Sequence, residues 1–185
     1  MAFTPSNMIP LGTKAPDFEL PDTVSGTIMR LEDVRGAQAT LVMFLCNHCP
    51  YVIHVNPEIV RLAKDYQAKG VGFVGISSND AEHYPDDAPD KMKITAANAG
   101  YTFPYLYDET QEVARNYDAA CTPDFYLFDQ HLALVYRGRL DDSRPGNQMP
   151  LTGTDLRKAI DAILEGRPVS ETQYPSGGCN IKWKK

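Results

Sequence analysis

The stretch that decides the fold is Ala39-Thr-Leu-Val-Met-Phe-Leu-Cys-Asn-His-Cys-Pro50. Its first seven residues form a continuous apolar run with β-branched and aromatic side chains, which predicts a strand buried on both faces. Pro50 suits the first turn of a helix, because the N–H that proline lacks would have no partner there. The helical pattern then continues to Gly70. The two cysteines of this stretch therefore lie where a buried strand ends and a helix begins.

The sequence on either side predicts an α/β fold in which strands and helices alternate. Polar residues separate two short segments near the start, which indicates a β-hairpin over 17–20 and 26–31. Residues 1–15 are expected to be an irregular lead-in and residues 170–185 a polar tail. The remaining predicted elements are strands over 71–76, 103–107, 124–129 and 132–140, helices over 91–99, 110–117 and 151–164, and a surface loop over 79–90. A capping signal is expected at Thr152-Gly-Thr-Asp155, where the last helix begins.

Composition indicates a soluble globular protein with a single domain over residues 1–185. Hydrophobic residues make up 43% of the chain and charged residues 23%, the usual balance of a folded domain. The net charge of −6, with scattered lysines and arginines, argues against binding of nucleic acid. No apolar run reaches the ~20 residues of a membrane helix, and the start does not resemble a signal peptide. We therefore expect a cytoplasmic protein that binds no membrane and needs no cofactor.

Cys46 and Cys49 form a C-x-x-C pair at the predicted start of the helix. A helix N-terminus offers unpaired N–H groups and about half a positive charge, and both stabilise a thiolate. Cysteine pKa values can fall from ~8.5 to between ~3.5 and ~7.5 in such settings. His48, between the two cysteines, can add charge or move protons. An inert, buried Cys46 is the alternative, but the spacing at a strand–helix junction favours redox chemistry.

On these residues the chain resembles the thioredoxin superfamily, and within it the peroxiredoxin-like branch of thiol-specific antioxidant, redoxin-like proteins. Thioredoxins carry an aromatic residue five positions before the attacking cysteine and a proline eight positions after it. Phe44 and Pro57 stand at these offsets from Cys49, so the resemblance implies that Cys49 is the nucleophile. It also implies a thioredoxin-like fold, with a mixed central β-sheet, helices on both faces and an N-terminal β-hairpin extension.

The resemblance extends to Cys121-Thr122-Pro123, which looks like the segment that carries the cis-proline of the superfamily. In the family, the residue before this proline lies against the reactive sulfur. Thr122 and Pro123 are therefore expected to line the site together with His48 and Pro50. The C-terminal stretch Pro175-Ser-Gly-Gly-Cys-Asn-Ile-Lys-Trp183 also resembles a signature of the peroxiredoxin-like group.

Three positions depart from the peroxiredoxin pattern. Peroxiredoxins have a proline seven positions before, and a threonine three positions before, the cysteine that attacks peroxide, and they use an arginine to hold the peroxide. Val42 and Cys46 occupy the first two places here, and Pro123 falls where the arginine would lie. Two groups that polarise the O–O bond are thus missing, so fast peroxide reduction is not expected.

The resulting hypothesis is a thiol–disulfide oxidoreductase in which the Cys49 thiolate attacks and a second cysteine resolves. Cys46 is the preferred resolving residue, because C-x-x-C spacing closes a short loop, and Cys121 is the alternative. Cys179 lies in a glycine-rich tail whose mobility could deliver it to the site, but it is expected to be a bystander. The expected substrates are a disulfide-containing protein or a small-molecule thiol or peroxide. The expected reducing partner is thioredoxin or glutathione.

Two other functions remain open from the residues. One is a weak thiol-dependent peroxidase in antioxidant defence. The other is metal binding, copper above all, through Cys46, Cys49 and a histidine, since soft thiolates select Cu(I). His54 is expected to be structural. Arg144, in a charged loop after the last strand, is expected to form a surface salt bridge, with contact to a thiolate or an anionic substrate as the alternative.

Overall fold

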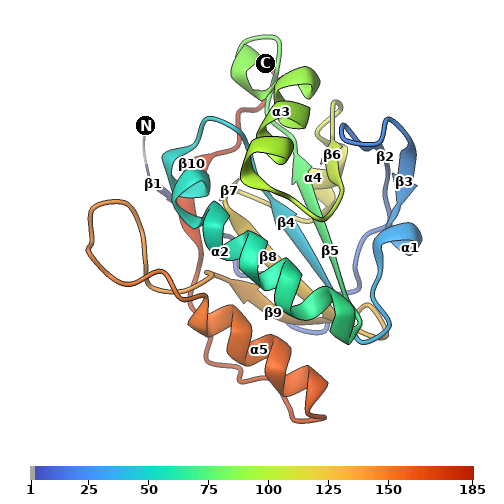
Figure 1. Ribbon diagram of the computed structural model, residues 1–185, viewed down its shortest axis with the longest axis vertical. Coiled ribbons are helices and arrows are strands. Elements are labelled where there is room, and N and C mark those ends of the chain that lie inside the picture. Colours follow the sequence, from blue (N-terminus) through green and yellow to red (C-terminus); the bar gives the residue numbers. More distant parts are fainter. Residues whose placement is uncertain (1–2) are drawn as a thin grey trace.

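The computed structural model describes residues 3–185 and contains a five-stranded mixed sheet with helices on both faces (Figure 1). The strand order is β6-β5-β4-β8-β9. β4, β5 and β6 run parallel, whereas β8 and β9 are antiparallel to their neighbours. The strands span Ala39–Phe44 (β4), Val71–Ser77 (β5), Tyr105–Tyr107 (β6), Asp124–Asp129 (β8) and Leu134–Gly138 (β9).

Two apolar cores lie on opposite faces of this sheet, which explains why β4 is hydrophobic at every position. Leu41 and Met43 belong to the core beneath three helices, and Val42 and Phe44 belong to the other core. Side chains alternate between the two faces of a strand, so a strand between two cores needs apolar residues throughout. The helices of the first face are α2 (Pro50–Tyr66), α3 (Pro89–Ala99) and α5 (Thr154–Leu164), and those of the second are α1 (Leu31–Val34) and α4 (Glu112–Asn116). Two 3-10 helices, η1 (Gln67–Lys69) and η2 (Pro85–Asp87), complete the helical set.

The predicted order of elements agrees with the structure, including the N-terminal hairpin. Its strands are β2 (Glu19–Pro21) and β3 (Ile28–Arg30), paired antiparallel. The capping signal expected for the last helix is wrong, because α5 begins at Thr154 after Gly153, whose φ is 66° and which makes no side-chain cap. The Asp141 carboxylate instead accepts the backbone N–H groups of Thr152 and Gly153. No helix in residues 3–185 has the length and apolar character needed to span a lipid bilayer.

The largest difference from the sequence prediction concerns the two ends of the chain. β1 (Phe3–Pro5), β10 (Gly177–Asn180) and β7 (Cys121–Thr122) form a second, antiparallel sheet in the order β1-β10-β7 (Figure 1). The irregular lead-in therefore contains a strand, as does the supposed tail; Met1 and Ala2 lie outside the described residues. Beyond β10, Ile181 is buried and the Lys182 backbone bonds to Asn79. The C-terminal segment is thus a fixed part of the fold.

Close contacts of the β10 backbone explain why two glycines, Gly177 and Gly178, precede Cys179. A Cβ on Gly178 would lie 2.0 Å from the Thr122 carbonyl oxygen of β7, and a Cβ on Gly177 would lie 2.1 Å from the ring of Phe3. Backbone can approach this closely only where no side chain intervenes. The glycines therefore let β10 lie flat against the segment that precedes Pro123.

We expect Gly178→Ala to weaken the docking of β10, because the added methyl group collides with backbone that cannot move aside. The expected loss of unfolding free energy is about 1–3 kcal/mol. Gly177→Ala is the matched control, since its methyl group meets only the Phe3 ring, which is half exposed and can rotate. Chemical denaturation of both variants would measure this difference. Equal stability of the two variants would contradict the close packing of β10 on β7.

Candidate active site

Cys49 lies where β4 and α2 meet, and three distant segments converge on its sulfur. It is the N-cap residue of α2, followed by Pro50 at the first helical position. Its Sγ lies 2.7 Å from the Sγ of Cys179 and 3.3 Å from the carbonyl oxygen of Thr122. The site is therefore built from the start of a helix, the end of β7 and the middle of β10.

The Thr122 segment presents polar atoms to two cysteines. The peptide bond between Thr122 and Pro123 is cis, as the resemblance implies. The Thr122 hydroxyl lies 3.3 Å from the Cys46 Sγ, while the Thr122 carbonyl faces Cys49. Because Thr122 is paired in register with Cys179, the same residue also sets the position of β10.

The environment of Cys49 lowers its pKa to about 5. The largest cause is a hydrogen bond from the Cys46 thiol, which outweighs the opposing effect of burial. A hydrogen bond from Cys179 and the backbone N–H groups of Val52 and Cys179 act in the same direction, although Cys49 makes no full N-cap hydrogen bond. The Thr122 carbonyl can accept only from the thiol form and so favours that form weakly. With a pKa near 5, Cys49 is a thiolate at neutral pH.

The other three cysteines are held as thiols. The hydrogen bond to Cys49, burial and the charge of Asp87 raise the pKa of Cys46 well above its usual value. Burial and the hydrogen bond to Cys49 raise the pKa of Cys179 to about 12. Burial, with the charge of Asp124, also raises the pKa of Cys121, whose Sγ faces the Pro123 carbonyl at 3.7 Å. The site thus contains one thiolate, Cys49, and two thiols in contact with it, Cys46 and Cys179. Cys121 is also a thiol, but it is directed elsewhere.

His48 pairs with a carboxylate that the sequence did not indicate. Its Nδ1 lies 2.6 Å from the Asp87 Oδ2, although the two are not aligned as a hydrogen bond. The contact with Asp87 raises the pKa of His48. Asp87 is fully buried and also accepts the backbone N–H of Asn47 and the amide of Asn79. The segment 79–90, expected to be a surface loop, therefore supplies a buried wall of the site, and only its acidic composition is visible in the sequence.

One group of side chains in residues 3–185 could hold a metal ion, namely Cys46, His48 and Asp87, whose ligand atoms lie within 4.8 Å of one another. Thiolate, imidazole and carboxylate are the ligand types of zinc. The set differs from the expected copper ligands, because Cys49 is absent from it and faces Cys179. A metal at this place would have to displace the proton of Cys46 and separate His48 from Asp87. His54 does not belong to the group and bonds to Ser143 instead.

The sulfurs are buried, and an aromatic pair lies beside the strand that carries Cys179. Cys49 is 0% exposed and Cys179 is 2% exposed. The rings of Phe3 and Tyr51 pack with their centroids 5.9 Å apart, and Phe3 also covers Gly177 of the strand that carries Cys179. Since nucleophilic attack requires contact with the sulfur, a substrate reaches Cys49 only when the packing around it opens locally.

Comparisons with known proteins show the family to which the chain belongs. The model of the AhpC/TSA family matches residues 11–137, which is more than half of the chain. An uncharacterized conserved protein from Geobacillus kaustophilus, known from its crystal structure, is 62% identical over all of this chain and 97% of its own, with a TM-score of 0.98. The thiol-disulfide oxidoreductase ResA of Geobacillus thermodenitrificans is 26% identical over 87% of this chain and 82% of its own.

A more distant structure establishes the fold. The thioredoxin domain of a thiol-disulfide oxidoreductase from Bacteroides vulgatus superposes with a TM-score of 0.61 at 19% identity, covering 80% of this chain and 97% of its own. The expected thioredoxin-like fold, with its mixed central sheet, is therefore confirmed. The small sheet β1-β10-β7 is an addition that the sequence prediction did not contain.

We expect the rate of Cys49 alkylation to follow a pKa near 5 in the wild type. Loss of a hydrogen bond to a charged group costs ~1.5–3 kcal/mol, so Cys46→Ala should raise the midpoint by about one to two pH units. Cys46→Ser, which keeps a donor, should restore part of this difference. Iodoacetamide labelling across pH, followed by mass spectrometry, measures each midpoint. The same midpoint in all three proteins would show that Cys46 does not tune Cys49.

Removal of the Phe3 ring should expose Cys49 without changing its charge. We expect Phe3→Ala to raise the rate of alkylation at pH 8 roughly fivefold, because local opening becomes easier, while the pH midpoint stays the same. Ile28→Ala, which removes another exposed apolar side chain far along the chain on β3, serves as the control. If Phe3→Ala and Ile28→Ala react at the same rate, the aromatic pair does not control access.

Proposed function

The chain belongs to the AhpC/TSA family of the thioredoxin superfamily, whose members are thiol-based redox proteins, and from this premise we propose a finer function. The protein is a thiol–disulfide oxidoreductase in which Cys49 is the nucleophile and Cys179 resolves the mixed disulfide. The observation that carries the proposal is the 2.7 Å separation of the two sulfurs. The low pKa of Cys49 supports its role as the attacking group.

In the first step, the Cys49 thiolate attacks one sulfur of the substrate disulfide. A bond forms between Cys49 and that sulfur, and the substrate S–S bond breaks. The departing thiolate takes up a proton and leaves as a thiol. His48, whose pKa is raised by Asp87, is an acid close in sequence to the reacting sulfur and can supply this proton.

In the second step, Cys179 loses its proton and attacks the Cys49 sulfur of the mixed disulfide. The remaining half of the substrate leaves as a thiol, and a Cys49–Cys179 disulfide forms. Overall, the substrate disulfide gains two electrons and the two cysteines lose them. The charge of the Cys49 thiolate no longer opposes ionisation of Cys179 at this stage, because the thiolate has become part of a neutral disulfide. A dithiol or glutathione must then reduce the protein.

The geometry supports Cys179 in the resolving role over the two cysteines that the sequence favoured. Cys46 contacts the Thr122 hydroxyl and lowers the pKa of Cys49, so it stabilises the nucleophile. Cys121 points toward the Pro123 carbonyl. Cys179, expected to be a bystander in a mobile tail, instead lies in a fixed strand against the thiolate.

A slower reaction with peroxide is the second candidate, because a thiolate also attacks an O–O bond. The product would be a sulfenic acid on Cys49, which Cys179 could condense to the same disulfide with loss of water. Pro123 still occupies the place where peroxiredoxins have arginine. We therefore propose disulfides as the preferred substrates.

One equivalent of bis(2-hydroxyethyl) disulfide should convert the reduced protein to a form with a Cys49–Cys179 bond, identified by peptide mapping. Cys46→Ser and Cys121→Ser should still form it. Cys179→Ser should stop at a mixed disulfide on Cys49, because the resolving thiol is missing.

A Cys46–Cys49 bond in the wild type would contradict the proposal and restore the sequence-based choice. The same experiment with hydrogen peroxide separates the two candidate activities. Oxidation by peroxide that is faster than oxidation by the disulfide would favour the peroxidase. Circular dichroism of each variant checks that the fold is retained.

A further inference from the structure

A small pocket is lined by residues from all three segments that hold the buried sulfurs. Tyr51 lies two residues after Cys49, Pro123 follows Thr122, and Gly177 lies two residues before Cys179; all three line the pocket. Its volume is about 70 Å³, which suits a small chemical group rather than a whole cofactor. A substrate bound here would therefore contact the rings of Phe3 and Tyr51, which also line the pocket.

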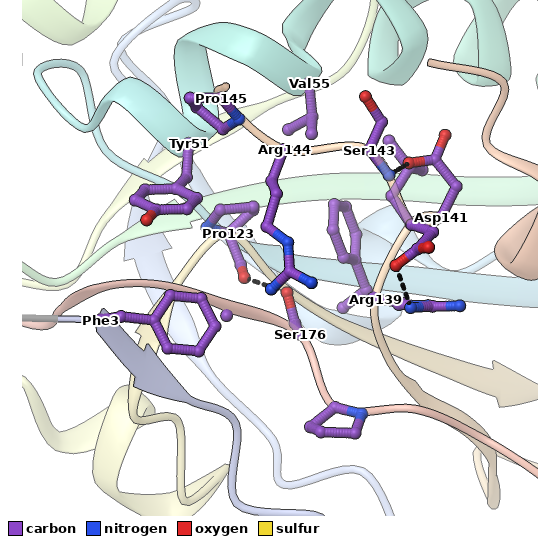
Figure 2. Close-up of a pocket in the computed structure, with 15 residues that line it drawn as sticks. Phe3, Tyr51, Val55, Pro123, Arg139, Asp141, Ser143, Arg144, Pro145 and Ser176 are labelled. Atoms are coloured by element: carbon purple, nitrogen blue, oxygen red, sulfur yellow. Dashed lines mark hydrogen bonds and ion pairs between the residues drawn. The ribbon is translucent and has the colours of Figure 1, made fainter. Parts of the chain in front are cut away.

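The loop after β9 contributes a cation to this pocket. Figure 2 shows the Arg144 side chain entering the space between Phe3, Pro123 and Ser176. The guanidinium lies 5.9 Å from the centre of the Phe3 ring, an aromatic contact that leaves its N–H groups available. Within residues 3–185 no carboxylate pairs with it, so the surface salt bridge expected from the sequence is wrong.

The other charged groups of the pocket already have hydrogen-bond partners within the protein. Arg139 binds the carboxylates of Asp142 and Asp155 at 2.6 and 2.7 Å. Asp141 accepts backbone N–H groups from Ser143, Thr152 and Gly153. Arg144 is therefore the charged group that remains available to a ligand among those that line the pocket in the described chain. Its planar set of N–H donors matches the two oxygens of a carboxylate.

On these observations, and resting on the proposed function, we propose that the pocket binds the carboxylate of a small disulfide substrate. Arg144 holds the carboxylate, the rings of Phe3 and Tyr51 contact the arm that follows it, and the disulfide bond lies toward Cys49. Arg144 touches the substrate away from the bond that reacts, so it determines specificity and takes no part in the exchange of electrons.

A preference for an anionic disulfide would be the opposite of what the net charge of the protein favours. The net charge is −6, and the nucleophile itself is an anion, so both disfavour the approach of an anionic disulfide. A neutral or cationic disulfide of the same size would react faster if the pocket had no role. A preference for the anion therefore requires a local cation.

Three disulfides of similar size test the inference, because they differ only in the charge of their ends: dithiodipropionate (anionic), bis(2-hydroxyethyl) disulfide (neutral) and cystamine (cationic). The rate of formation of the Cys49–Cys179 bond is measured with each and divided by the rate of the same disulfide with a free model thiol. We expect the corrected rate to be highest with dithiodipropionate. Arg144→Gln should lower that rate about tenfold, as expected for loss of a charge-assisted contact, and should change the neutral rate less than twofold.

Arg144→Lys should keep part of the preference, because it retains the charge. Arg167→Gln is the control, since Arg167 is exposed, pairs with Glu165 and does not line the pocket. Equal losses with all three disulfides, or no loss in Arg144→Gln, would overturn the carboxylate site while leaving the redox activity in place. A wild type that reacts with none of the three would instead overturn the proposed function, and the carboxylate site with it.

Discussion

The contact between Cys49 and Cys179 is the interaction on which the site depends. A thiolate in a fully buried place is costly unless hydrogen-bond donors surround it. Cys46 and Cys179 supply two side-chain donors, and Val52 in the first turn of α2 and Cys179 in β10 supply backbone N–H groups. These donors come from the β4–α2 junction and from β10. The ionised sulfur is therefore stabilised only when β10 is packed against the start of the helix.

This arrangement explains features that otherwise look unrelated. Gly178, next to Cys179, is needed because β10 lies directly against the Thr122 carbonyl. Buried Asp87 holds the C-x-x-C turn through the Asn47 backbone and His48. β1 covers the free edge of β10, and its Phe3 is paired in register with Cys179. Protection of a reactive thiolate from solvent and its activation are thus achieved by the same strands.

Much of the fold followed from hydrophobic patterning, because the strands and helices that bury two cores carry strong periodic signals. The C-x-x-C turn and the cis-proline segment were also visible, since both have distinctive local residues. The small sheet was not, because Gly177 and Gly178 have low strand propensity and are explained only by contact with Phe3 of β1 and with β7. Pairings between distant segments leave no local signal. For this reason Asp87 looked like part of a solvated loop and Cys179 like part of a mobile tail.

Because Cys49 and Cys179 are far apart along the chain, oxidation would also change the stability of the fold. The two residues are 130 positions apart, so a bond between them would close most of the chain into one covalent loop. By chain-entropy reasoning, a loop of this length raises the free energy of unfolding by about 5 kcal/mol, far more than a C-x-x-C bond that closes three residues. The oxidised and reduced proteins would then differ in resistance to heat and proteases as well as in chemistry. A partner that displaces β10 from the start of α2 could not do so in the oxidised form, because the disulfide would hold the two together.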